Sequence, residues 1–125
     1  MRLFVDCDDT LILFDSEGPH PFGATAYNEP FHFNEPLIAF IRRFRQRNFD
    51  DLIIIWSGGG RKYAQTVAEM VGLDDIGAGY LIKDRTTFDL VRKQDIVVDD
   101  QKLAVSAVIT PPDFFGDAEK WGSLD

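Results

Sequence analysis

The chain has 125 residues, with 13 Lys and Arg against 21 Asp and Glu, so its formal charge is −8, and its apolar content of 45% is ordinary for a globular protein. This length predicts a single domain, residues 1–125, with enough core to fold without disulfides or a structural metal. The one cysteine, Cys7, excludes an intrachain disulfide. An acidic balance of this size disfavours a general nucleic-acid-coating protein, because phosphate backbones repel it.

The same features predict a cytoplasmic protein. Asp6, Asp8 and Asp9 interrupt the N-terminus too early for the apolar stretch of a signal peptide, and low cysteine usage is typical of a reducing compartment. The purest apolar run, Leu52–Trp56, is five residues long, much shorter than a membrane span. We therefore expect no membrane as a partner.

The first predicted elements alternate between strand and helix. Leu3–Val5 is a short apolar run that stops at carboxylates, which predicts a buried strand. Apolar residues at helical spacing behind a proline-containing cap predict a helix over residues 35–47. Leu52–Trp56 predicts a second buried strand. Residues 14–33 form a long irregular insertion, interpreted as a flap over a site because loops of this length are usually functional or disordered.

The second half of the chain continues this alternation. The apolar residues between Tyr63 and Val71 predict a helix that Gly72 ends in the left-handed conformation. The remaining expected elements are a weak strand at Gly79–Ile82, a short helix at residues 85–92, a strand at Ile96–Val98, a last strand at residues 105–109 and an acidic tail at residues 110–125. Alternating strands and helices predict an α/β fold with a mainly parallel sheet and helices on both faces.

Reactive side chains follow three of these strands where each strand ends. Asp6-Cys7-Asp8-Asp9-Thr10 follows the first strand, Ser57-Gly58-Gly59-Gly60 the second and Asp99-Asp100 the third confident one. Because parallel strands end at the same edge of a sheet, where α/β folds bind ligands, these groups should meet. Lys83 follows the weak strand, so one cleft is expected to hold carboxylates, a hydroxyl and an amine.

This order of motifs resembles the haloacid dehalogenase (HAD) superfamily of phosphatases and phosphotransferases. Asp6-x-Asp8-x-Thr10-Leu11 is similar to the family's first motif, in which the leading aspartate is the nucleophile and the second is the general acid and base. The other matches are Ser57 for the second motif, which binds the phosphoryl group, Lys83 for the third, with Lys93 as a rival, and Asp99-Asp100 for the fourth, which holds magnesium.

The resemblance implies a Rossmann-like three-layer sandwich without a cap domain, since the spacing between motifs leaves no room for one. It implies a Mg²⁺-dependent phosphatase that acts on a phosphomonoester through an aspartyl-phosphate intermediate. Asp8 favours phosphatase over dehalogenase, because family members that cleave carbon–halogen bonds lack it. The resemblance implies that the catalytic residues are Asp6 and Asp8. The implied phosphate-binding residues are Thr10, Ser57, Gly58 and Lys83. The implied metal-binding residues are Asp6, Asp8 through its carbonyl, Asp99 and Asp100, and either Asp99 or Asp100 can be the direct ligand.

General chemistry supports the same assignment. A carboxylate can attack phosphorus and divide hydrolysis into two steps, but a dianionic substrate is repelled by several carboxylates unless a cation intervenes. Magnesium prefers such hard oxygen ligands. The substrate is expected to be a phosphorylated compound of open identity. A polynucleotide substrate is not favoured, because the net charge of the chain is −8. The protein can be a homo-oligomer, because some capless members of the family act as oligomers.

Two alternative functions remain open. A response-regulator receiver domain has a similar sheet and also phosphorylates an aspartate, but its phospho-acceptor follows the third strand. Here no strand-borne aspartate lies between the Asp8 and Asp99 motifs, which disfavours a receiver-like signalling module. A catalytically inactive HAD-like binding protein is the other alternative, although the intact motifs give no reason for inactivity.

The remaining polar residues have structural interpretations. Cys7 should point away from its neighbouring aspartates, and no arginine follows closely to support a cysteine nucleophile. His20 and His32 are interpreted as flap residues rather than metal ligands. The arginines between Arg42 and Arg47 fall off the apolar helix face, so we expect a solvated outer surface rather than a nucleic-acid site.

Overall fold

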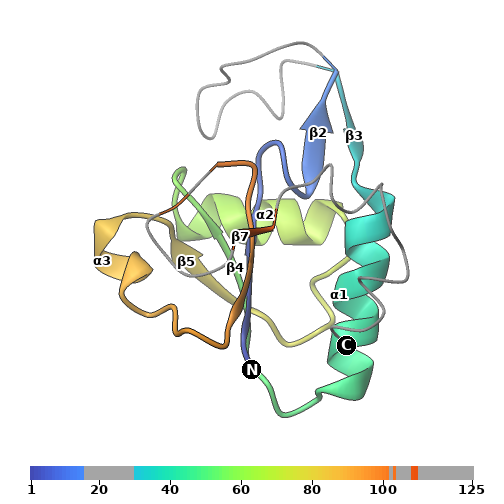
Figure 1. The fold of residues 1–125 in the computed structure, drawn as a ribbon. Helices are drawn as coiled ribbons and strands as arrows, with labels where there is room; N and C mark the ends of the chain where they lie inside the picture. Colours follow the sequence, from blue (N-terminus) through green and yellow to red (C-terminus); the bar gives the residue numbers. More distant parts are fainter. Residues whose placement is uncertain (16–29, 102, 104–107, 110–125) are drawn as a thin grey trace.

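The computed structural model describes residues 1–15, 30–101, 103 and 108–109 (Figure 1). The predicted tail at residues 110–125 lies outside the described residues, as do residues 16–29 of the insertion and residues 105–107 of the last expected strand.

Five strands form one sheet in the order β5-β4-β1-β6-β7, and every neighbouring pair is parallel. Their bounds are β1 Leu3–Asp6, β4 Ile53–Ser57, β5 Gly79–Ile82, β6 Ile96–Val98 and β7 Val108–Ile109. The prediction of an α/β fold with a mainly parallel sheet is confirmed. Because β1 lies in the middle, residues that follow it emerge between the ends of β4 and β6.

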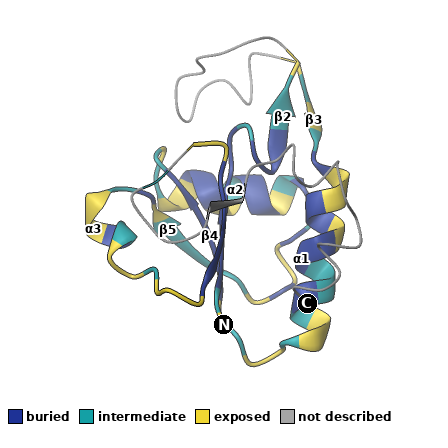
Figure 2. Cartoon of the chain, viewed as in Figure 1, coloured by how far each residue is buried: buried dark blue, intermediate teal, exposed yellow. Residues whose placement is uncertain are grey.

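Alternate strand residues face opposite sides of the sheet. On one side, Leu3 and Val5 pack in a buried cluster with residues of α1 (Glu35–Arg47) and α2 (Arg61–Met70). On the other side, Phe4 and Trp56 pack against Phe88 of α3 (Arg85–Phe88). Figure 2 shows the central strands buried and α1 exposed along its outer side. These contacts relate α1 and α2 to one side of the sheet and Phe88 of α3 to the other.

The helices follow their local signals. The Asn34 side chain accepts a hydrogen bond from the Leu37 N–H at the start of α1, which has the predicted bounds. Gly72 has φ +79° just after α2, as expected for a residue that stops a helix. Within the part of the chain that the structure describes, no helix is long and apolar enough to cross a membrane.

The predicted helix at residues 85–92 is too long. The structure ends α3 at Phe88, and the chain continues in tight turns in which the N–H groups of Leu90 and Val91 bond to carbonyls three residues earlier. Leu90 is exposed, whereas Val91 still packs against the cluster that contains Phe4 and Trp56. The Asp84 capping box fixes the start of α3 but supplies nothing to lengthen it.

The insertion is not irregular at its two ends. β2 (Ile12–Phe14) and β3 (Phe31–Phe33) pair antiparallel as a separate two-stranded sheet. The His32 Nδ1 atom lies 2.8 Å from the Asp15 carboxylate in this hairpin stem. The role of the insertion as a flap stays a prediction, and His20 lies outside the described residues.

Candidate functional site

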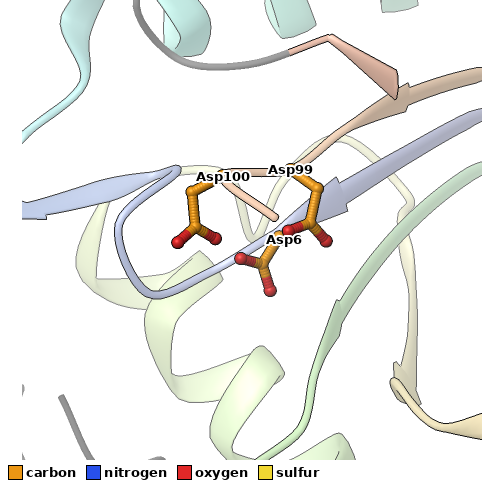
Figure 3. Close-up of side chains that lie close together, drawn as sticks. All are labelled: Asp6, Asp99 and Asp100. Atoms are coloured by element: carbon orange, nitrogen blue, oxygen red, sulfur yellow. The ribbon is translucent and has the colours of Figure 1, made fainter. Parts of the chain in front are cut away.

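Three aspartates meet at the carboxyl edge of the sheet. Asp6 ends the central strand β1, and Asp99 and Asp100 follow β6 next to it. One carboxylate oxygen from each lies within 4.8 Å of the others, and Figure 3 shows Asp6 placed beside the other two. Asp6 and Asp99 are buried, whereas Asp100 is exposed. We call Asp6, Asp99 and Asp100 the acidic cluster.

Lys83 supplies a cation to this cluster from two strands away. Its ammonium group donates hydrogen bonds of 2.9 Å to Asp6 Oδ1 and to Asp99 Oδ2. Its backbone N–H donates to the Ser57 carbonyl oxygen at 2.8 Å, which joins the ends of β5 and β4. Lys93, the rival candidate, is exposed. The structure therefore brings Lys83 to the carboxylates.

A tight turn carries the chain from Asp6 back toward the cluster. The Cys7 carbonyl oxygen accepts from the N–H groups of Thr10, Leu11 and Ile12 at 3.2, 2.9 and 3.2 Å. Asp9 takes φ +58° within this turn, a left-handed conformation that aspartate tolerates better than most residues. The chain reversal leaves Cys7 in the apolar core and returns Thr10 to Asp6.

The buried Thr10 hydroxyl links two parts of the site. It donates to Asp6 Oδ2 and accepts from the Asp100 N–H, both at 3.1 Å. The Asn34 side chain in turn donates to the Thr10 carbonyl oxygen at 2.9 Å. Because these bonds hold the Asp6 side chain and the loop after β6 together, Thr10 has a clear structural role. Its predicted part in phosphate binding stays a prediction.

Asp8 is buried beside the turn, and its carboxylate Oδ1 accepts a hydrogen bond from the Tyr63 hydroxyl. The sequence pattern predicts Tyr63 only as a residue of the apolar face of α2. The available signal was its chemistry, since a buried tyrosine usually directs its hydroxyl to a polar partner. The identity of that partner, 55 residues away, was not visible from the sequence.

Ser57 and Gly58 lie at the end of β4, beside β1. The Ser57 hydroxyl accepts from the Gly59 N–H at 3.0 Å, and its carbonyl oxygen accepts from the Gly60 N–H at 3.1 Å. Among the described residues, the Ser57 side chain makes no hydrogen bond to the acidic cluster. Gly60 precedes α2 without a side-chain cap, so the Ser57 hydroxyl does not cap this helix.

The electrostatics of the cluster favour uptake of positive charge. Burial, helped by the charge of Asp99, raises the pKa of Asp6 well above its usual value, although Lys83 opposes the shift. Although Asp100 is partly open to solvent, desolvation on its inner side and the charges of Asp99 and Asp9 raise its pKa to about 6, against a lowering hydrogen bond with Asp6. Burial lowers the pKa of Lys83, but Asp6 and Asp99 outweigh it and the net pKa is raised. Among the described residues, the Lys83 ammonium group thus bonds to two of the three carboxylates of the acidic cluster.

Cys7 stands between Asp6 and Asp8 in the chain, but its side chain is buried in the apolar core. Burial and the charge of Asp6 raise the pKa of the Cys7 thiol well above its usual value, which opposes a thiolate nucleophile.

The prediction of a solvated arginine surface on α1 is only partly correct. Arg42 donates to the Gly72 carbonyl oxygen, and Arg45 donates to those of Ile76 and Asp51 at 2.8 and 2.7 Å, so both arginines are used to fasten loops.

Comparison of the chain with protein families, with curated proteins and with solved structures finds no match. Any assignment of function to this protein therefore rests on the residues described above.

Proposed function

We propose that this protein is a Mg²⁺-dependent phosphatase of the HAD type, with a Rossmann-like three-layer fold, that hydrolyses a phosphomonoester through an aspartyl phosphate on Asp6. The observation that carries the proposal is the buried Asp6–Lys83–Asp99 arrangement at the carboxyl edge of a parallel sheet. Asp8, two residues beyond Asp6, supplies the second carboxyl group that hydrolysis needs.

The residues at this edge fit a magnesium ion. Asp6, Asp99 and Asp100 offer hard carboxylate oxygens within 4.8 Å of one another, and the backbone carbonyl of Asp8 is the further ligand in the proposal. Lys83 balances only one of the three carboxylate charges. Bound magnesium would neutralise charge on the phosphoryl oxygens and so allow the substrate to approach.

The first chemical step transfers the phosphoryl group to Asp6. A carboxylate oxygen of Asp6 forms a bond to phosphorus while the ester P–O bond breaks, and the Asp8 carboxyl group gives its proton to the leaving oxygen. The hydrogen bonds from Thr10 and Lys83 fix the Asp6 side chain for this attack. Lys83, Ser57 and the backbone N–H groups near Gly58 are the proposed partners of the phosphoryl oxygens.

The second step releases phosphate. A water oxygen forms a bond to the phosphorus of the aspartyl phosphate, Asp8 accepts the water proton, and the bond between phosphorus and Asp6 breaks. The Asp6 carboxylate is regenerated, and Asp8 regains the proton that the next turnover uses.

The test is a screen of the purified protein against sugar phosphates, nucleotides, phosphopeptides and 3′-phosphorylated oligonucleotides, with magnesium and with excess chelator. We expect phosphate release from at least one class with magnesium, no release with chelator, and no release by the Asp6→Asn variant. Asp9→Asn is the matched control, since asparagine also tolerates the left-handed conformation at this position. Turnover in excess chelator contradicts the proposal. Phosphorylation by a small donor without turnover favours the receiver-like module instead, and binding without either reaction favours an inactive binding protein.

A further inference from the structure

Tyr63 lies on α2, and its hydroxyl forms a hydrogen bond to Asp8, the proposed general acid and base. The residue is buried, with 8% of its surface exposed, among the apolar residues between the sheet and α2. Its hydroxyl donates to Oδ1 of Asp8, which is also buried. This contact joins α2 to the turn that follows β1.

A fixed backbone does not by itself orient the Asp8 carboxyl group. The Cys7 carbonyl oxygen holds the turn through three backbone N–H groups, but the aspartate side chain still has two rotatable bonds. A donor that binds Oδ1 selects one orientation of the carboxyl plane. The bond from Tyr63 to Oδ1 therefore restricts the orientations in which the Asp8 carboxyl group can meet a substrate.

We infer that Tyr63 is a positioning residue that holds the Asp8 carboxyl group in the orientation from which it protonates the leaving oxygen. The inference rests on the proposed phosphatase function. Tyr63 donates its hydrogen bond to Asp8 and exchanges no proton with the substrate. In the step concerned, an Asp6 oxygen forms a bond to phosphorus, the ester P–O bond breaks with its electron pair going to the leaving oxygen, and the proton passes from the Asp8 carboxyl group to that oxygen.

This role predicts a dependence on the leaving group. An alkoxide leaves poorly without a proton, so an alkyl phosphate needs a well-placed general acid. A 4-nitrophenolate ion is stable without one, so 4-nitrophenyl phosphate needs no such help in the first step. Because kcat/KM reports the reaction up to the first irreversible step, loss of the Tyr63 hydroxyl should lower kcat/KM for the alkyl ester alone.

The experiment compares Tyr63→Phe with wild-type protein on glycerol 3-phosphate and 4-nitrophenyl phosphate, with magnesium. Phenylalanine keeps the ring that packs in the core. We expect kcat/KM for glycerol 3-phosphate to fall about tenfold or more, as for a misplaced catalytic group, and kcat/KM for 4-nitrophenyl phosphate to change less than about twofold. Tyr80→Phe is the matched control, because Tyr80 is a half-buried tyrosine on β5, and it should leave both values unchanged.

Two further measurements keep the outcome decisive. Tyr63→Leu, which also lacks the hydroxyl, should show the same substrate dependence. In the Asp8→Asn background, Tyr63→Phe should add no further loss on 4-nitrophenyl phosphate or on glycerol 3-phosphate, because the residue acts through Asp8. An equal loss on both esters, no loss on either, or an additive loss in the Asp8→Asn background overturns the inference while leaving the phosphatase function intact. Absence of turnover by wild-type protein on every phosphate tested refutes the proposed function itself.

Discussion

Replacing Lys83 by methionine removes the cation that the described residues supply to the acidic cluster, while it keeps a long unbranched side chain. Lys83, Asp6 and Asp99 are exposed by only 7%, 3% and 0%, so water cannot readily replace the lost ammonium group. Removing one member of a buried ion pair costs about 3–5 kcal/mol. Two hydrogen bonds of 2.9 Å are lost together here, which places Lys83→Met within that range.

The size of this loss depends on pH and on magnesium. A carboxyl group whose pKa is raised by folding costs stability above its unfolded pKa, and that cost disappears as the pH falls and the group is protonated. The pKa of Asp6 is already raised by burial and by Asp99, and Lys83→Met raises it further. The loss should therefore be smaller at pH 5 than at pH 7. Magnesium at about 100 times its Kd should restore about 2.7 kcal/mol.

The assay is urea unfolding followed by circular dichroism, at both pH values, with chelator or with excess magnesium. Since small domains are stable by about 5–15 kcal/mol, the variant should fold in chelator with a clearly lower midpoint. Lys93→Met, at an exposed lysine, is the matched control and should change stability by less than about 0.5 kcal/mol. Equal stability of Lys83→Met and wild-type protein in chelator at pH 7 would refute the inferred role of Lys83 in charge balance.

Three other predictions follow from the same structure. Because the pKa of Asp100 is raised to about 6, calorimetry should show magnesium affinity falling up to about tenfold per pH unit below that value. Burial raises the pKa of Asp95, but hydrogen bonds from Arg2 and from backbone N–H groups outweigh it and lower the net pKa. Asp95→Asn should cost about 2 kcal/mol at pH 7, and urea titrations should show this difference vanishing as the pH falls below the lowered pKa. Gly72→Ala should cost about 1–2 kcal/mol in the same assay because φ is +79°; a cost near zero would mean that the turn adapts.

The sequence predicted the elements whose signals are local. Strands β1, β4 and β6 are short apolar runs, and α1 carries both a cap and an apolar face, so their positions were predictable within one or two residues. Parallel pairing then places Asp6, Asp99 and Lys83 at one edge. Alternation of strands with helices was sufficient to expect this arrangement.

The features of the fold and the site that the sequence did not predict are very short strands and contacts between residues far apart in the chain. Strands β2 and β3 have three residues each, too few for a periodic signal. The bond between Tyr63 and Asp8 spans 55 residues, and the bond between Thr10 and Asp100 spans 90. No pattern along the chain specifies such partners.

The covalent intermediate offers the most direct test of Asp6 as the nucleophile. The Asp8→Asn variant should slow hydrolysis of the aspartyl phosphate because it cannot accept the water proton. After brief incubation with 4-nitrophenyl phosphate and magnesium, followed by acid quenching and peptide mass spectrometry, one phosphoryl group should be found on Asp6. A phosphoryl group on Ser57, Cys7 or Asp99, or phosphate release by an Asp6→Asn variant at the wild-type rate, would contradict the proposed mechanism.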